Sequence, residues 1–431
     1  MNISPKALKV KWMLARQHLQ VICEQTGFSF FYNLAQNMRI IGGDVCKSSI
    51  VCWELFETPG DLRQHFKTNR RKKQDDDLTF HLNRDGEADF IDFIKGADCL
   101  CMEPTGVNYS FLWEKIAQVC NVPIRWIGHP EVKYLRKSER LPDKNDQADA
   151  LTLALYAIKN WEKQTAFLRF ESGIVSQVNE LYLDLKSLAA HNAAAINKCR
   201  HKLAKEFPEA AFIRSVPGAD GLSPLFAWVA QRPRYTSRGH RKYDRLYAES
   251  IAPKYITISE FTRYLANQVC DNHLWDYKMT QRLSKLVYNS PAFLKFNQTF
   301  DLYRFGLMTR TMLLIKCYPL SRFDSVGAFK RRLGFGQQEN SSGDITRFHS
   351  VGSSLAKTEL YLWCVGAIGK KRLTSEVGLE IQRKFEHYKQ QLSQQQPDQD
   401  STGKFTDLVR SKTIAFMLRR LFRDLKRNCT D

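Results

Sequence analysis

The segment from residue 40 to residue 55 decides the fold, and it reads IIGGDVCKSSIVCWEL. Its two ends, residues 40–44 and residues 50–55, are rich in apolar and β-branched residues and are typical of strands. The few residues between them predict a tight connection. The first strand ends on Asp44, so a carboxylate stands at the end of a hydrophobic strand.

Outward from this pair, the chain alternates between strand-like and helix-like segments. Further strands are predicted at residues 78–82, 99–102 and 124–127. Helical patterns mark residues 90–94, 109–119 and 146–161. Three strands followed by alternating helices and strands predict an α/β domain with a mixed sheet flanked by helices.

The next segment carries a heptad pattern. Spacings of four and three residues alternate along Ile174, Val178, Leu181, Leu185, Leu188, Asn192, Ala195 and Cys199. Such a pattern is the seam of a coiled coil, and a polar residue at one core position is typical of coiled coils with a fixed register. We predict a coiled coil that forms within one chain or between chains, with an ordinary core helix as the alternative.

The charge of the chain indicates a polyanionic partner. Its 431 residues contain 65 Lys and Arg against 45 Asp and Glu, which gives a formal net charge of +20. A surplus of this size favours nucleic acid or an anionic membrane surface. No apolar run approaches the roughly 18 residues of a spanning helix, so we expect no membrane association. The 11 cysteines lack C-x-x-C spacing, which argues against zinc ribbons and for reduced thiols.

Two segments combine cations with aromatic or apolar residues. Residues 232–243 interleave tyrosines with the cations Arg234, Arg238 and Arg241. Such a surface binds phosphates while stacking unpaired bases, and a solvated loop is the equal alternative. The last helix, near residues 412–427, has one apolar face, and its basic residues include Arg419 and Arg420. We expect that basic side to meet phosphate or to be solvated.

Four carboxylates stand out by their positions. Asp44 ends a strand, Glu103 directly follows another, and Asp146 and Asp149 open a predicted helix. Residues at i and i+3 share a helix face, so both aspartates can point toward the strand ends. Oxygen ligands suit Mg²⁺ or Mn²⁺, and two such ions roughly 3.5–4 Å apart promote phosphoryl transfer. Each acid alone is more simply a surface residue or a helix cap, but the pattern of four predicts a divalent-metal site.

These acids lie in four short blocks of sequence. The blocks are Gly42-x-Asp44-Val45-x-Lys47, Glu103-x-Thr105-Gly106, Pro130-x-Val132-Lys133 and Lys144-x-Asp146-x-x-Asp149-Ala150. Their order and spacing resemble the DEDD transposases of the IS-one-ten family, which includes the Piv pilin-gene invertases. The resemblance covers residues 38–165 and implies a RuvC-like, RNase-H-type domain. It also implies that the metal ligands are Asp44, Glu103, Asp146 and Asp149.

The chain departs from that family at two positions of these blocks. Gly43 stands where an aliphatic residue is usual, and His129 stands where the family commonly has Asn. We expect neither residue to touch a ligand carboxylate. The basic residues of the blocks are expected to contact nucleic acid or to offset the acidic charge; they are Lys47, Lys133 and Lys144.

The resemblance continues in the C-terminal part of the chain. It rests on Phe323-Asp324-Ser325, Leu333-Gly334-Phe335, Ser341-Ser342-Gly343 and Gly352. In the family, a Ser-Gly at this place supplies a serine that attacks DNA and forms a covalent phosphoserine. The match is Ser342, with Ser341 as the second choice. Nearby cations expected to bind the scissile backbone are Lys330, Arg331, Arg332 and Arg347.

The chemistry of such a serine fits a metal cluster. A serine hydroxyl is a poor nucleophile at neutral pH and needs a base or metal coordination. The sequence signals no His-Asp pair for this task, so the acidic cluster would activate Ser342 if the C-terminal part folds onto it. Apart from the resemblance, Ser342 is more simply a polar loop residue beside a turn glycine.

The resemblance implies a DNA transposase or site-specific recombinase that cleaves and rejoins DNA through a serine nucleophile with Mg²⁺ or Mn²⁺. Expected partners are donor and target DNA and a structured bridge RNA, in the bacterial cytoplasm at the nucleoid. A Piv-like DNA invertase without a guide RNA is one alternative. A metal-dependent RuvC-like nuclease or Holliday-junction resolvase is another, and a catalytically silent nucleic-acid-binding protein is a third. The coiled coil and the need to hold two DNA sites predict a homodimer or homotetramer.

The predicted organisation has five parts. They are an N-terminal extension (1–37), the RuvC-like catalytic domain (38–165), the coiled coil (166–214), a basic nucleic-acid-binding insert (215–300) and a mainly helical C-terminal transposase domain (301–431).

Overall fold

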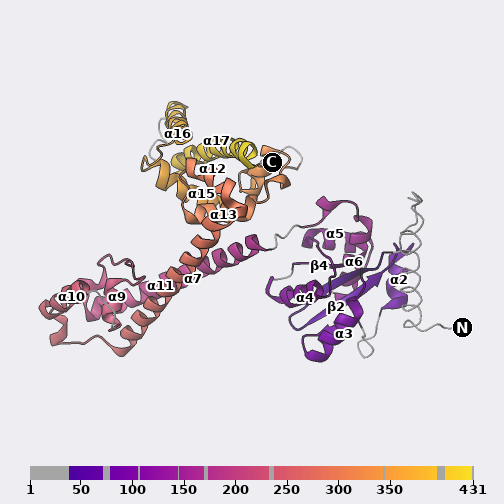
Figure 1. The fold of residues 1–431 in the computed structure, drawn as a ribbon, viewed down its shortest axis with the longest axis horizontal. Helices are drawn as coiled ribbons and strands as arrows, with labels where there is room; N and C mark the ends of the chain where they lie inside the picture. Colours follow the sequence, from indigo (N-terminus) through magenta and orange to yellow (C-terminus); the bar gives the residue numbers. More distant parts are fainter. Residues whose placement is uncertain are drawn as a thin grey trace. The chain divides into compact units, whose positions relative to one another are not determined.

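The computed structural model divides the chain into two compact units, Met1–Phe170 and Glu171–Asp431 (Figure 1). It describes residues 38–70, 78–104, 107–143, 145–168, 173–232, 237–342, 345–395 and 403–429. The extension predicted at residues 1–37 lies outside these residues. Each unit is described by itself.

The first unit is built on a mixed sheet of five strands. They are β1 (Ile40–Val45), β2 (Ser49–Leu55), β3 (Thr79–His81), β4 (Cys99–Met102) and β5 (Ile124–Trp126), in the order β3-β2-β1-β4-β5. β2 is antiparallel to β1 and β3, whereas β4 is parallel to β1 and β5. The predicted mixed sheet is therefore confirmed. The three parallel strands β1, β4 and β5 end at the same edge of the sheet.

Helices cover both faces of this sheet. They are α2 (Leu62–Asn69), α3 (Arg84–Ile94), α4 (Val107–Val119), α5 (His129–Ser138), α6 (Asp146–Lys159) and the short η1 (Gln164–Ala166). Successive side chains of a strand point to opposite faces. Ile41 accordingly packs in a core with Phe90 and Trp113 of α3 and α4. Ile40 packs in the other core, with Val132 of α5 and Leu151 of α6.

The second unit contains a long antiparallel helix pair, α7 (Ile174–Glu206) and α11 (Glu260–Asn289). Val178 near the start of α7 shares a core with Val287 near the end of α11. Cys199 near the end of α7 shares another core with Leu265 near the start of α11. The heptad seam of α7 therefore packs within one chain, and it gives no support to the predicted homodimer or homotetramer. The predicted boundary at residue 214 assigns α7 and α11 to different parts of the chain, although the two helices pack together.

One group of short helices joins α7 to α11. It comprises α8 (Pro208–Ala211), α9 (Pro224–Val229), α10 (Ser237–Glu249) and η2 (Ala252–Lys254). These elements enclose a core around the buried rings of Phe207 and Phe226. Of the basic segment predicted here, Arg234 lies outside the described residues, the backbone of Arg238 lies in α10, and Arg241 is exposed on α10.

The C-terminal part of the second unit is mostly helical. Its elements are η3 (Pro291–Phe293), α12 (Leu294–Leu302), α13 (Leu307–Cys317), η4 (Leu320–Arg322), α14 (Val326–Arg332), β6 (Gly336–Ser342), β7 (Ile345–Val351), α15 (Ser354–Trp363), η5 (Cys364–Ile368), α16 (Glu376–Gln395) and α17 (Gly403–Cys429). The predicted apolar face of the last helix is confirmed, since Ile414, Met417 and Leu421 are fully buried. The β6–β7 hairpin is an element that the sequence did not indicate. No helix of the described part is long and apolar enough to cross a membrane.

Candidate metal centre

The site begins with a close approach between β1 and α6. A Cβ atom placed on Gly42 would lie 1.9 Å from the carbonyl oxygen of Ala150 and 2.6 Å from the backbone nitrogen of Ala154. No side chain larger than hydrogen fits there, since real Cβ atoms do not come within 3.0 Å of other heavy atoms. Gly42 thus lets the first turns of α6 lie directly on the central strand.

Strand alternation then directs Asp44 toward the same helix. Ile40, Gly42 and Asp44 occupy alternate positions of β1, and Ile40 and Gly42 face α6. Cys99 and Cys101 of β4 belong to the same core as Ile40, and Glu103 follows at the next alternate position. The residue pairing of β1 with β4 sets Gly43 opposite Met102, so Asp44 and Glu103 leave the sheet at neighbouring points.

The start of α6 adds the other two acids. Asn145 is the N-cap of this helix, and its side-chain oxygen accepts a hydrogen bond from the backbone nitrogen of Ala148 at 2.9 Å. Asp146 is therefore not needed as the cap, and both Asp146 and Asp149 lie in the first turn. Asp146 is exposed, whereas Asp149 is half-buried.

Burial and the negative charges of three of the predicted acids raise the pKa of the fourth, Asp44. The pKa of Asp44 is raised to about 7, first by burial and then by the negative charges of Asp149, Asp146 and Glu103. Burial likewise raises the pKa of Asp149, and Asp146 adds to that effect. Three segments distant in sequence thus gather like charges that repel one another, and such crowding is relieved by a proton or a cation.

Two basic side chains of α5 partly offset this charge. The Arg136 guanidinium donates to the Asp149 carboxylate and also lies 3.5 Å from Asp143. The imidazole of His129, the first residue of α5, contacts the Glu103 carboxylate through Nδ1. The expectation that His129 touches no ligand carboxylate is therefore wrong. His129 begins α5 three residues after the end of β5, and Glu103 directly follows the end of β4. Polar residues just beyond two adjacent parallel strands were therefore the available sequence signal.

Cys46 is a further neighbour that the sequence did not indicate. Its thiol lies 3.7 Å from a carboxylate oxygen of Asp146. Burial and the charges of Asp146 and Asp44 raise the pKa of this thiol to about 11, so it is protonated at neutral pH. One ligand atom each of Asp44, Cys46 and Asp146 lie within 4.8 Å of one another, a spacing that fits a single cation.

The donor set fits a hard divalent cation. Carboxylate oxygens are the protein ligands that Mg²⁺ and Mn²⁺ prefer. Among the described residues, no Lys or Arg forms an ion pair with Asp44 or Asp146. Glu103 and Asp149, by contrast, have the partners His129 and Arg136.

Two of the three basic residues predicted around this centre are exposed. Lys47 lies in the turn between β1 and β2, and Lys133 lies on α5, both exposed. Lys144 lies outside the described residues. Gly43, the other departure from the family pattern, faces the other core, because a Cβ there would meet Ile50 at 2.7 Å.

The predicted serine belongs to the other unit. Ser341 and Ser342 are the last residues of β6, where Ser341 pairs with Thr346 and Ser342 with Ile345, so both lie at the tip of the β6–β7 hairpin. Gly343 lies outside the described residues, and for Ser342 the structure describes the backbone. The hairpin base is closely packed, since a Cβ on Gly352 would lie 1.8 Å from the carbonyl oxygen of Arg331.

Some of the cationic side chains that were predicted to bind DNA lie near the base of this hairpin. Arg331 and Arg332 are exposed at the end of α14. Burial and the charge of Arg419 lower the pKa of Lys330, so α14 and α17 bring two like charges together. Arg420 is engaged differently, because its guanidinium lies 3.0 Å from Glu380 and 3.2 Å from the buried Asp424. The backbone of Arg347 lies in β7.

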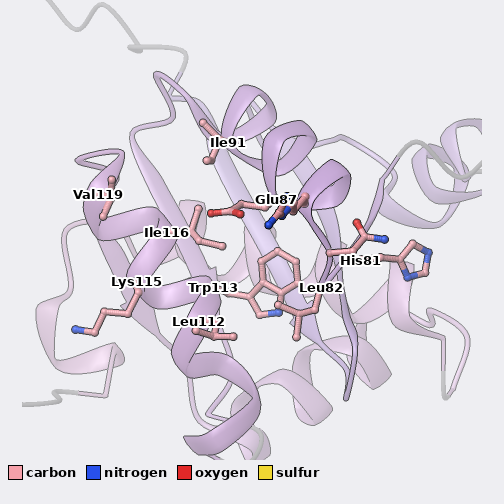
Figure 2. A pocket seen from close by; sticks show the side chains of 11 residues that line it. His81, Leu82, Glu87, Ile91, Leu112, Trp113, Lys115, Ile116 and Val119 are labelled. Carbon is pink, nitrogen blue, oxygen red and sulfur yellow. The ribbon is translucent and has the colours of Figure 1, made fainter.

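The first unit also has an apolar pocket that the acids do not line. Figure 2 shows this hollow between α3 and α4, with Trp113 at its floor and Leu112, Ile116 and Val119 along one side. Its volume is about 520 Å³. The indole nitrogen of Trp113 is buried without a hydrogen-bond partner in the described part of the chain.

Comparison with known proteins adds no relative. No protein-family model matches the chain, and no curated protein matches it.

Proposed function

We propose that the first unit is the RuvC-like, metal-dependent catalytic domain of a DNA transposase or site-specific recombinase. One observation carries the proposal. Asp44 at the end of the central strand and Asp146 at the start of α6, distant in sequence, bring ligand atoms within 4.8 Å of each other beside Cys46. A mixed sheet with its acids at the edge where its parallel strands end supports the RNase-H-type assignment.

The four carboxylates have distinct parts in this proposal. Asp44 and Asp146 would hold a divalent cation, with Glu103 and Asp149 beside them. Bound Mg²⁺ or Mn²⁺ neutralises charge that develops on a phosphoryl group and polarises its oxygen. Arg136 holds Asp149 in place, and the close contact at Gly42 holds α6 against β1.

Serine chemistry completes the proposal. The hydroxyl oxygen of Ser342 would attack a backbone phosphorus and lose its proton, while the P–O bond to one DNA strand breaks. The leaving oxygen would take up a proton and become the terminal hydroxyl of the released strand. The phosphoserine conserves the phosphodiester bond energy, so rejoining needs no ATP. The positive charge of the chain, +20, suits donor and target DNA together with a bridge RNA.

Metal binding is tested by titrating Mn²⁺ into the full chain by calorimetry at pH 8. We expect Asp44→Asn and Asp146→Asn to lose at least about tenfold in affinity, or about 1.4 kcal/mol. Asp89→Asn, an exposed acid on α3, is the matched control. Equal Mn²⁺ binding by all variants would reject the metal centre.

The serine is tested with a DNA substrate and denaturing gels that detect protein–DNA adducts. A recombinase loses its covalent adduct and strand joining in Ser342→Ala but keeps both in Ser341→Ala. Cutting that persists in Ser342→Ala, without an adduct in wild type, would identify a nuclease or resolvase. RNA that co-purifies with the protein and maps beside its gene would favour a bridge RNA over a Piv-like invertase.

A further inference from the structure

Three large aromatic rings are exposed along one face of α11. Phe261, Tyr264 and Trp275 have exposed fractions of 45, 54 and 59%. Their spacing of three and eleven residues returns to the same side of an α-helix, which has 3.6 residues per turn. At 1.5 Å per residue, this aromatic stripe (Phe261, Tyr264 and Trp275) extends about 21 Å along the helix.

Two of the rings are nearly parallel neighbours. The Phe261 and Tyr264 centroids lie 6.1 Å apart with an interplanar angle of 24°. The Tyr264 hydroxyl accepts a hydrogen bond from the side-chain amide of Gln268 at 2.8 Å, which orients that ring. The stripe therefore presents flat apolar faces of defined orientation rather than a loose apolar patch.

Lysines of the neighbouring helix α7 and of α11 itself lie over this stripe. Lys198 and Lys202 of α7 place their ammonium groups 5.4 and 5.7 Å from the Phe261 centroid, and Lys278 lies 5.4 Å from the Trp275 centroid. Residues 185–205 of α7 contain five Lys and Arg and no acid. Of the acids on α11, Glu260 and Asp276 are exposed and directly adjoin Phe261 and Trp275 in sequence, whereas Asp271 lies 2.7 Å from Arg232.

We infer that the aromatic stripe and the lysines of α7 bind a single-stranded segment of RNA, with rings stacking on unpaired bases and ammonium groups contacting phosphates. Aromatic faces interleaved with cations are the surface that single-stranded nucleic acids require. An apolar protein partner would not use the positive charge of Lys198 and Lys202, which are exposed and form no ion pair in the described part of the chain. The choice of RNA rests on the proposed function, because the DNA of a recombinase is duplex and keeps its bases stacked, whereas RNA loops offer them freely.

The test measures fluorescence anisotropy of a labelled 15-nucleotide oligouridylate with the full chain. The exposed rings are replaced in Phe261→Ala, Tyr264→Ala and Trp275→Ala, singly and together. We expect a loss of about 5–150-fold per ring, as stacking contributes about 1–3 kcal/mol per base. Trp275→Phe retains a ring and should retain most of the affinity. Lys198→Gln with Lys202→Gln should reduce the salt slope of log K by about 1.4, for two phosphate contacts.

The matched control is Phe111→Ala in the first unit. Phe111 is 50% exposed and also carries a lysine, Lys115, 5.3 Å from its ring centroid. Unchanged RNA affinity in the triple variant, with an unchanged circular dichroism spectrum, would overturn the inference. The inference would also be overturned if the triple variant lost no more RNA affinity than Phe111→Ala does. Tighter binding of wild type to the matching oligothymidylate DNA than to the oligouridylate would overturn it as well.

Two further measurements distinguish RNA binding by the aromatic stripe from metal binding and from self-association of the chain. Asp44→Asn should bind the oligouridylate as wild type does, so failure of the metal centre and failure of the stripe are distinguishable. Sedimentation shows whether the stripe instead joins two copies of the chain. A triple variant that changes the sedimentation coefficient but not the RNA affinity would contradict RNA binding.

Discussion

The carbonyl oxygen of Ala150 occupies the space where a side chain of Gly42 would lie, 1.9 Å from its Cβ position. This contact joins the central strand to the helix that supplies two of the four acids. The geometry of the candidate centre thus depends on a residue with no chemistry of its own. Because both partners are backbone atoms, neither can move aside as a flexible side chain would.

Replacing Gly42 tests this dependence. We expect Gly42→Ala to lower the free energy of unfolding by about 3 kcal/mol or more, since overpacking a rigid core costs about 1–3 kcal/mol even where side chains adjust. It should also weaken Mn²⁺ binding by displacing α6. The control is Gly60→Ala, whose added Cβ meets nothing within 4 Å. Chemical denaturation that finds the two variants equally stable would contradict the close approach.

The raised pKa of Asp44 leads us to expect an unusual dependence of stability on pH. Because its pKa is raised from 3.8 to about 7 in the fold, ionising it costs stability as pH rises from 4 to 7. Without divalent ions, Asp44→Asn should therefore be more stable than wild type at pH 8, by at most about 4 kcal/mol. The two should be equally stable near pH 4.

Divalent ions should reverse that order. At pH 8, Mn²⁺ should stabilise wild type by binding the native state, while Asp44→Asn gains little. Thermal melts at pH 4, 6 and 8, with and without Mn²⁺, measure both effects. Asp89→Asn should follow wild type throughout, and an Asp44→Asn variant that is less stable at pH 8 without metal would contradict the crowding of charges.

Arg136 is predicted to hold the acidic cluster together before a cation binds. Its side chain and that of Asp149 are only 14 and 20% exposed. Arg136→Gln should destabilise the protein by about 2 kcal/mol at pH 8, because Asp149 is left partly buried and unpaired. The loss should shrink toward pH 4 as the carboxylates take up protons. Lys137→Gln, on an exposed position of the same helix, should change the unfolding free energy by less than about 0.5 kcal/mol in urea titrations.

A substitution at Asn192 tests whether the α7 seam packs within one chain or between chains. Its side-chain oxygen is buried and has no hydrogen-bond partner in the described part of the chain. Asn192→Leu should raise the free energy of unfolding by about 1 kcal/mol or more, as a buried unsatisfied group costs about 1–3 kcal/mol. The sedimentation coefficient should stay unchanged, because α7 pairs with α11 of the same chain. A change in oligomeric state would contradict that pairing, and exposed Asn197→Leu is the control.

Local sequence patterns predicted much of this protein. Strand and helix periodicities depend on neighbouring residues, so β1 to β5, α6 and the apolar face of α17 were predicted closely. The strand-end positions of Asp44 and Glu103 and the i, i+3 pair on α6 also followed from local order. These features need no knowledge of how distant segments pack.

Only the tertiary structure placed the residues that act across segments. The contacts of His129, Arg136 and Cys46 with the acids depend on how α5 and the β1–β2 turn meet the sheet edge. The pairing of α7 with α11 likewise joins helices separated by more than 50 residues. It could not be predicted, because a heptad pattern indicates that a helix has a partner but does not identify that partner. Sequence thus supplied the chemical groups and their local direction, and packing of distant backbone, as at Gly42 and Ala150, decided which groups meet.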